Sequence, residues 1–299
     1  MSSYHIPVLL EESIAGLNIR PDGTYVDLTF GGGGHTRAIL SKLDRGRVIA
    51  FDQDEASLKN APEDHRLILL QQNFRFLKNN LRYLEILQVD GILADLGVSS
   101  HHLDQGARGF SFRESADLDM RMNKRQKKTA ADILNRYPAA ELERVFRDYA
   151  EIRHPRRLVE LILRAREQRE IRKTGELTAV LKPMMGERIS HKFLARVFQA
   201  LRIEVNEEME ALREMLEQTP EVTAPGARLV VISYHSLEDR MVKTFMKTGS
   251  VNPPEEDHPF ERRQPPFRMI SKKVITPPAG EIARNPRSRS ARLRIAERI

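Results

Sequence analysis

The chain has 299 residues, of which 40% are hydrophobic, enough for one large domain or two smaller ones. It contains no cysteine, which excludes disulfides, thiolate zinc sites and a cysteine nucleophile, and fits a reducing compartment. The N-terminus lacks the features of a signal peptide, and no run reaches the roughly 18 apolar residues of a membrane span. We therefore expect a soluble cytoplasmic protein with no membrane partner.

The net charge of +7 is unevenly distributed along the chain. Residues 121–173 hold 16 Lys and Arg against 8 Asp and Glu, and residues 262–299 hold 11 against 2. The rest of the chain carries a net charge of −10. Two basic segments on an acidic body indicate a polyanionic partner such as a nucleic acid. The alternative for the first segment is a solvated helix face.

Apolar runs and helical patterns alternate in the first hundred residues, which is typical of βαβ units with a parallel sheet. A further strand is predicted only much later, at 228–234, after a turn at Pro225-Gly226. Late in the chain, 273–275 and 292–296 fit an edge hairpin. The first four strands are predicted at 24–29, 47–51, 66–70 and 89–95, with helices at 36–43, 55–60 and 74–87.

The long gap before the fifth strand is helical in pattern. A wholly helical block within an α/β sheet predicts an inserted domain, which we place at 105–200 and expect to recognise the substrate. The remaining segments, 1–104 and 201–299, then form one discontinuous domain. The helices of this later part are predicted at 130–137, 139–149, 155–170, 176–184, 192–216 and 237–247.

Four consecutive glycines, 31–34, follow the first strand and precede a helix, as in nucleotide-binding loops. The dinucleotide fingerprint fails, because its sixth position would be Thr36 or Arg37 instead of glycine. The residues fit Asp-x-x-x-Gly-x-Gly instead, formed by Asp27, Gly31 and Gly33. A carboxylate here favours a ligand with a cationic amine or sulfonium and repels a pyrophosphate. The pattern therefore favours S-adenosylmethionine over NAD as cofactor.

Two further acids end predicted strands, where open α/β sheets bind their ligands. Asp52 lies 18 residues after Gly34, the place of an acid that binds ribose hydroxyls; capping of the next helix is the alternative, which Asp54 could also provide. Asp95 ends the fourth strand and should face the reaction site, where it could orient an exocyclic amine. A helix cap is again the alternative. Phe74 could flank an adenine or belong to the core.

The fifth strand runs into Tyr234 and His235, a stacking surface and a candidate base. A helix cap by Ser236 with Asp239 as its partner is favoured for the following turn. His101 and His102 form no metal-ligand spacing with carboxylates, so no metal site is predicted.

Together these residues resemble the MraW/RsmH family of 16S rRNA (cytosine-N4)-methyltransferases across essentially the whole chain. The match rests on many long motifs in the same order. They are His5-x-Pro-Val-Leu-Leu-x-Glu12, Thr29-Phe-Gly-x-Gly-Gly-His35, Asp95-Leu-Gly-Val-Ser-Ser100, Arg108-Gly-Phe-Ser-Phe112, Leu118-Asp-Met-Arg-Met122, Phe198-Gln-Ala-x-Arg-Ile203, Ser233-x-His-Ser-Leu-Glu-Asp-Arg240 and Asn285-Pro-Arg-x-Arg-Ser290.

The resemblance implies a class I (Rossmann-like) S-adenosylmethionine-dependent methyltransferase sheet with an inserted helical domain. It implies methyl transfer to the N4 amine of a decoding-region (P-site) cytidine in 16S rRNA, within the 30S subunit or a late assembly intermediate. A homodimer is left open. The family's cofactor contacts carry over to Gly33, Gly34, His35, Asp52, Phe74 and Asp95, whereas His102 stands where the family commonly has a cofactor-contacting glutamine.

For the reaction we expect direct in-line displacement without metal or covalent intermediate, with Asp95 orienting the amine and His235 or water receiving the proton. Phe110, Phe112 or Tyr234 would pack against the target base. Arg287 and Arg289 of the basic tail would hold rRNA phosphates. Three other classes remain open: a methyltransferase of small molecules or proteins, an NAD oxidoreductase, and a non-catalytic rRNA-binding assembly factor.

Overall fold

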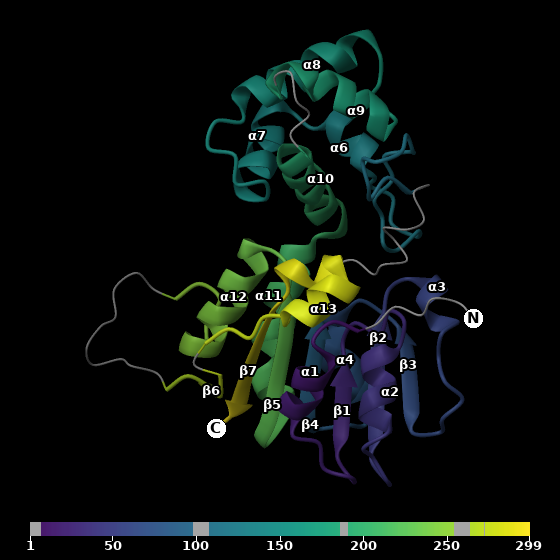
Figure 1. Ribbon diagram of the computed structural model, residues 1–299, viewed down its shortest axis with the longest axis vertical. Helices are drawn as coiled ribbons and strands as arrows, with labels where there is room; N and C mark the ends of the chain where they lie inside the picture. Colours follow the sequence, from purple (N-terminus) through teal and green to yellow (C-terminus); the bar gives the residue numbers. More distant parts are fainter. Residues whose placement is uncertain (1–6, 98–107, 186–190, 254–263, 272) are drawn as a thin grey trace. The chain divides into compact units, whose positions relative to one another are not determined.

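The computed structural model describes residues 7–97, 108–185, 191–253, 264–271 and 273–299 (Figure 1). The chain divides into two units. Unit 1 comprises Met1–Gly97 and Met209–Ile299, and unit 2 comprises Val98–Glu208. Unit 2 thus starts seven residues before the insert boundary expected from the sequence and ends eight residues after it.

Unit 1 is built on a seven-stranded sheet with the order β3-β2-β1-β4-β5-β7-β6. The first five strands of that order are parallel, whereas β7 is antiparallel to β5 and β6 is antiparallel to β7. This mixed α/β topology confirms the predicted class I fold. The strands are β1 (Thr24–Asp27), β2 (Arg47–Asp52), β3 (Leu67–Gln71), β4 (Val89–Asp95), β5 (Thr223–Ser233), β6 (Phe267–Met269) and β7 (Arg292–Arg298).

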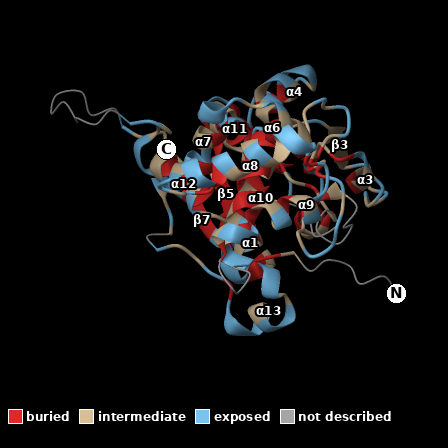
Figure 2. Ribbon diagram, turned by 90° about the horizontal axis from the view of Figure 1, so that it is seen from above, coloured by how far each residue is buried: buried red, intermediate tan, exposed pale blue. Residues whose placement is uncertain are grey.

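Helices cover both faces of this sheet and bury its apolar side chains in two separate layers (Figures 1 and 2). One layer packs α1 (Leu10–Leu17) and α2 (Gly34–Leu40) on the sheet, and the other packs α4 (Leu77–Tyr83), α11 (Glu208–Val222) and α12 (Ser236–Thr248). Unit 1 also contains α3 (Glu55–Leu58), the 3-10 turn η1 (Phe74–Phe76), α13 (Ala279–Arg284) and the 3-10 turn η4 (Pro286–Ser290).

The alternation of side chains along the strands decides which polar groups meet. Val26 on β1 and Ile92 on β4 point into the layer of α4, α11 and α12, whereas Tyr25 and Leu93 point into the layer of α1 and α2. Successive strand residues face opposite sides, and Asp27 is paired in register with Leu93. Asp27, Leu93 and Asp95 therefore lie on the face covered by α1 and α2.

Unit 2 is helical and has its own core. Leu134, Phe146, Leu158, Leu177 and Leu201 are among its completely buried side chains. Among the described residues of both units, no helix has the length and apolar composition needed to cross a bilayer. The helices of unit 2 are α6 (Ala130–Arg136), α7 (Ala139–Asp148), α8 (Arg156–Gln168), α9 (Thr174–Leu181), the 3-10 turn η3 (Lys182–Met184) and α10 (His191–Asn206).

Three details of the predicted elements differ from the structure. The single helix expected at 192–216 is divided at Glu207, whose φ of 51° is left-handed and incompatible with a continuous helix, into α10 and α11. The turn expected at Pro225-Gly226 lies within β5, where the register against β4 shifts. The edge hairpin pairs β7 with β6, whereas Ile275 forms only an isolated bridge with Leu293.

Candidate functional site

The glycine loop between β1 and α2 contains two residues whose backbone angles are left-handed. Gly31 and Gly33 have φ values of 52° and 74°, which favour glycine. A Cβ on Gly31 would meet only the Thr29 carbonyl, at 3.8 Å, so there is free space above this residue. A Cβ on Gly34 would instead overlap the Pro7 ring. The glycines therefore serve different purposes: two set the backbone of the loop, and Gly34 admits the N-terminal segment.

Asp27, expected to face the cofactor, is completely buried under the loop. Its Oδ2 accepts a hydrogen bond from Thr36 Oγ1 at 2.6 Å, and its Oδ1 accepts one from the Thr29 N–H at 3.1 Å. Burial raises its pKa, and the nearby His35 and these hydrogen bonds oppose that rise. The structure therefore corrects the sequence interpretation. Asp27 is bonded to Thr29 and Thr36 on either side of the glycines, and its carboxylate is not exposed to a ligand.

Asp52 joins the end of β2 to the glycine loop. Its Oδ2 accepts a hydrogen bond from the Gly31 N–H and its Oδ1 one from the Asp54 N–H, both at 2.8 Å. The side chain of Asp54, not Asp52, caps α3 by accepting from the Ala56 N–H. Burial raises the pKa of Asp52. Each carboxylate oxygen still has a lone pair to accept a further bond, so Asp52 can bind the loop and a hydroxyl group together.

Asp95 at the end of β4 is held from two sides. Its Oδ1 accepts a hydrogen bond from the Tyr234 hydroxyl at 2.8 Å, and its backbone N–H donates to Thr29 Oγ1 at 2.6 Å. Burial raises the pKa of Asp95 to about 6, although His35 and the Tyr234 hydroxyl oppose the rise. Burial and the charge of Asp95 also raise the pKa of Tyr234, which keeps its hydroxyl protonated as a donor.

His35 lies on α2 beside this carboxylate and is buried, with 5% of its surface exposed. Its Nδ1 lies 3.9 Å from Asp95 Oδ2, and its Nε2 lies 3.1 Å from the Val8 carbonyl oxygen. The structure therefore brings His35, Asp95 and Tyr234 together, from three segments that are far apart in the chain.

His235, the candidate base, begins α12 as its cap. Its ring accepts from the Glu238 N–H, and the Glu238 carboxylate accepts the N–H groups of Tyr234 and His235, at 2.8 and 3.4 Å. The predicted cap by Ser236 with Asp239 is thus wrong by one residue. Asp239 instead binds Arg294 in a buried ion pair, with Oδ1 2.7 Å from the Arg294 Nε. His235 therefore caps α12 and is bound to Glu238.

The other predicted residues are spread over both units. Phe74 is partly buried against the layer of α4, α11 and α12. Phe110 and Phe112 belong to unit 2, where Phe110 is a core residue with 8% of its surface exposed and Phe112 packs edge-on against Phe198. Core burial leaves Phe110 little surface for a target base. Arg287 and Arg289 are exposed on η4, and His102 lies outside the described residues.

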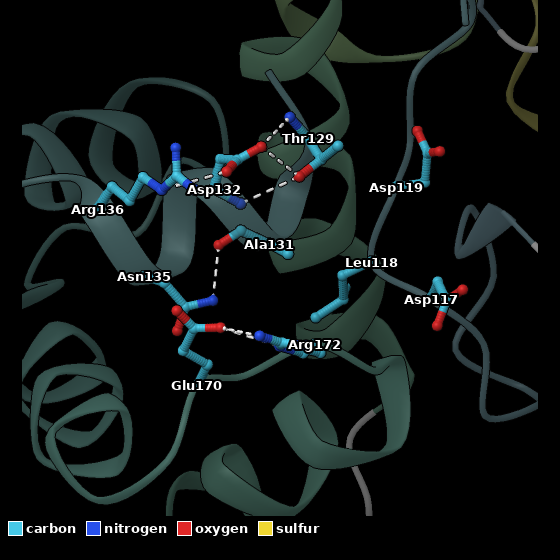
Figure 3. A pocket seen from close by; sticks show the side chains of 10 residues that line it. All are labelled: Asp117, Leu118, Asp119, Thr129, Ala131, Asp132, Asn135, Arg136, Glu170 and Arg172. Atoms are coloured by element: carbon cyan, nitrogen blue, oxygen red, sulfur yellow. Dashed lines mark hydrogen bonds and ion pairs between the residues drawn. The ribbon is translucent and has the colours of Figure 1, made fainter. Parts of the chain in front are cut away.

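Unit 2 also contains a pocket of about 350 Å³ that none of the predicted site residues line (Figure 3). Its charged groups largely satisfy one another: Arg136 pairs with Asp132, and Arg172 with Glu170. The Asn135 amide donates to the Ala131 carbonyl inside the same helix. The polar lining is thus committed to the local structure of unit 2, and the candidate site lies in unit 1.

Four polar residues of the loop region were missed by sequence reasoning. Thr29 and Thr36 both donate to the Asp27 carboxylate, and Thr29 Oγ1 also accepts the Asp95 N–H. Arg37 donates to the Gly32 carbonyl at 2.7 Å, and Asn60 donates to the Gly31 carbonyl at 3.3 Å. Thr29 and Thr36 flank the four glycines, which was a usable signal, whereas nothing local pointed to Asn60.

The comparison with known families agrees with this geometry. A family model described as the MraW methylase family matches residues 2–299. The chain belongs to this family. It is 57% identical to the ribosomal RNA small subunit methyltransferase H of Bacteroides thetaiotaomicron, over 99% of this chain and 98% of the relative, and 50% identical to that of Flavobacterium johnsoniae, over 99% and 98%. The predicted identity as an S-adenosylmethionine-dependent methyltransferase is confirmed.

Solved structures show weaker likeness to the chain. An rRNA methylase from Streptococcus thermophilus is 12% identical with a TM-score of 0.44, over 99% of each chain. The family assignment rests on the sequence matches alone.

The residues of unit 1 fit the methyl donor of this family. The free space above Gly31 leaves the loop backbone open to a ligand, and Asp52 has acceptor capacity beside it. Burial of a carboxylate such as Asp95 near a cationic sulfonium is favourable, because the opposite charge offsets part of the cost of desolvation. Gly31, Asp52 and Asp95 are therefore candidates among the residues expected to hold S-adenosylmethionine.

Proposed function

We propose that this protein transfers a methyl group from S-adenosylmethionine to the exocyclic N4 amine of a decoding-region (P-site) cytidine in 16S rRNA. The observation that carries the proposal is the Asp95 carboxylate, which is partly buried beside His35 and has one oxygen bonded to Tyr234. Relatives named ribosomal RNA small subunit methyltransferase H match it from end to end, which supports rRNA as the substrate.

The chemistry of an amine acceptor explains a carboxylate at this position. The lone pair of an exocyclic amine is conjugated with its ring, so a hydrogen-bond acceptor that binds an N–H group helps the nitrogen pyramidalise. The Asp95 carboxylate can accept that N–H while its position is fixed by Tyr234. When bound, S-adenosylmethionine supplies an electrophilic methyl group on a sulfonium, which becomes a neutral thioether after transfer. Methylation at cytosine C5 would require a cysteine nucleophile, and the chain has none.

Unit 2 offers a surface suited to an RNA backbone, and we assign it the recognition of rRNA. Several arginines there form ion pairs: Arg136 with Asp132, Arg144 with Glu204 and Arg169 with Glu176, for example. Four others are exposed around α8, along which Figure 2 shows exposed segments, and no described residue pairs with them. These four form the α8 arginine cluster: Arg153, Arg156, Arg157 and Arg164.

Unpaired, exposed guanidinium groups are the type of side chain that binds phosphates without reading sequence. The α8 arginine cluster lies within the basic segment 121–173. An arginine that is paired with a carboxylate adds no net charge, so the surplus of this segment comes from unpaired cations such as these. Exposed Arg289 of η4 adds a further cation in unit 1. These charges favour an RNA substrate over a small molecule, which would need no such surface.

The proposal is tested by product analysis. The purified protein is incubated with labelled S-adenosylmethionine and naked 16S rRNA, 30S subunits, a late assembly intermediate or 70S ribosomes, and the modified nucleoside is identified after digestion. We expect N4-methylated cytidine at a P-site position, with 30S subunits or the late intermediate as the best substrate. The Asp95→Asn protein should lose the activity. Any other methylated nucleoside would refute the proposal, as would methylation that does not require RNA.

A further inference from the structure

The tautomer of His35 is set by the N-terminal segment. Its Nε2 lies 3.1 Å from the Val8 carbonyl oxygen, in a buried setting. A carbonyl oxygen can only accept a hydrogen bond, so the neutral ring must carry its proton on Nε2. The lone pair of neutral His35 is then on Nδ1, the atom that faces Asp95 Oδ2 at 3.9 Å. Asp95 thus has a buried proton acceptor beside it.

The two oxygens of Asp95 have different neighbours. Oδ1 accepts the Tyr234 hydroxyl at 2.8 Å, and this bond leaves Oδ2 for the substrate amine and for His35. A separation of 3.9 Å is longer than a hydrogen bond, and catalytic contacts of this kind are often long before substrate is bound. The charged or titratable groups that influence Asp95 from the packed elements are His35 of α2, Tyr234 after β5, Asp27 of β1 and Glu238 of α12.

We propose that His35 and Tyr234 act through Asp95 in methyl transfer: Tyr234 fixes Oδ1, Oδ2 accepts the proton released by the N4 amine, and His35 Nδ1 receives it. The N–C bond forms as the S–C bond breaks, and the S–C electron pair stays on sulfur. The methylated amine then loses one proton, which passes to Asp95 and on to His35. His35 and Tyr234 are positioning residues, because they act on the substrate only through Asp95. This inference rests on the proposed function.

This assignment changes the roles expected for two side chains. Tyr234, expected to stack on the target base, has its hydroxyl bound to Asp95. His235, expected to be the base, is bound to Glu238 at the start of α12. Because burial raises the pKa of Asp95 to about 6, its carboxylate is ionised at pH 8 and needs little energy to take up a proton.

The test uses the full-length protein with 30S subunits, measuring the single-turnover rate from pH 5.5 to 8.5 at saturating S-adenosylmethionine. The variants are His35→Gln, which keeps a donor for Val8 but has no titratable nitrogen, and Tyr234→Phe. His65→Gln is the control, because His65 is an exposed histidine of unit 1. The affinity for S-adenosylmethionine is measured by calorimetry, and circular dichroism verifies that each variant is folded.

The wild-type rate should rise with pH to a plateau, with a midpoint at or below the Asp95 pKa of about 6, because the bound sulfonium favours the carboxylate. At saturating S-adenosylmethionine, His35→Gln should lower that plateau by about 10²-fold, as expected for loss of a proton acceptor. Tyr234→Phe should move the midpoint to higher pH, because the lost hydrogen bond lowers the pKa of Asp95 in the wild type. His65→Gln should follow the wild-type curve.

Two results would overturn the inference. A His35→Gln plateau equal to that of the wild type at pH 8.5 would mean that His35 only tunes the charge of Asp95. An unmoved midpoint in Tyr234→Phe would mean that Tyr234 does not hold the reactive carboxylate. The proposed function is judged separately, by the nucleoside that the wild-type protein forms, so its failure is distinguishable from failure of the proton path.

Discussion

Substitution of Gly33 by alanine tests how the loop is built, because this position combines two separate steric demands. Its φ is 74°, and a Cβ would lie 2.8 Å from the Phe30 ring and 2.9 Å from Arg37 Nη1. Phe30 is buried with 3% of its surface exposed, so the ring has little room to move. Arg37 Nη1 is bonded to the Gly32 carbonyl, and moving it would break that bond.

The expected cost can be worked out from these two demands. A left-handed conformation costs an alanine about 1–2 kcal/mol. Crowding of a packed neighbour adds about 1–3 kcal/mol. Gly226→Ala is a matched control, since Gly226 has a φ of 81° but no atom within 4 Å of its Cβ position. The control should therefore be destabilised only by the cost of the left-handed conformation.

Both variants are measured by urea unfolding followed by far-UV circular dichroism, and by calorimetric titration with S-adenosylmethionine. Gly33→Ala should be less stable than Gly226→Ala by about 1–3 kcal/mol. Its Kd for S-adenosylmethionine should rise about tenfold or more, since a loss of 1.4 kcal/mol in binding is a factor of ten. Equal stability of the two variants, or an unchanged Kd in Gly33→Ala, would refute the reasoning.

Three further substitutions test other parts of the molecule. Asp239→Asn should lower the free energy of unfolding by about 3–5 kcal/mol, because Arg294 is left buried without its partner. The pKa of Asp239 is lowered in the folded state, so its contribution is complete above its unfolded pKa and is lost as the pH falls through the folded pKa. Urea unfolding between pH 7 and 3 should therefore show a larger loss of stability in the wild type than in Asp239→Asn. Asp52→Asn should weaken S-adenosylmethionine binding about tenfold by calorimetry, since an acceptor bearing a charge is replaced by a neutral one. Alanines in the α8 arginine cluster should reduce the salt dependence of RNA binding by about 0.7 in log–log slope for each lost phosphate contact, whereas alanines in an equal number of ion-paired arginines such as Arg169 should change it less.

The strand ends of the parallel sheet were predictable because their pattern is local. Apolar runs bounded by turn residues located β1, β2 and β4 closely, and Asp52 and Asp95 were correctly expected at strand ends. The alternation of side chains also shows, from sequence alone, that Leu93 and Asp95 share a face. What the alternation does not show is how deep each acid lies, and Asp27 is buried completely whereas Asp52 is not.

The errors arose where contacts between distant residues decide the structure. The predicted helix cap was an i, i+3 pair of Ser236 and Asp239, but Asp239 is bound by Arg294 from β7, 55 residues away. The edge strand was expected at 273–275. The strand that pairs with β7 is β6, whose Phe267 is anchored by burial against Phe245 at a ring distance of 6.0 Å. Short segments have too little local pattern to outweigh such anchoring contacts.

The N-terminal motif shows why a run of glycines cannot be interpreted from its own neighbourhood. Pro7 lies where a Gly34 side chain would be, and the next residue, Val8, binds the ring of His35 through its carbonyl. The Leu9 N–H in turn donates to Glu281 of α13 at 3.0 Å. Gly34 is therefore required by a segment 27 residues upstream, whereas Gly31 and Gly33 are required by their own backbone angles. If the N-terminal segment sets the protonated nitrogen of His35, the glycine that admits this segment affects the reaction through His35.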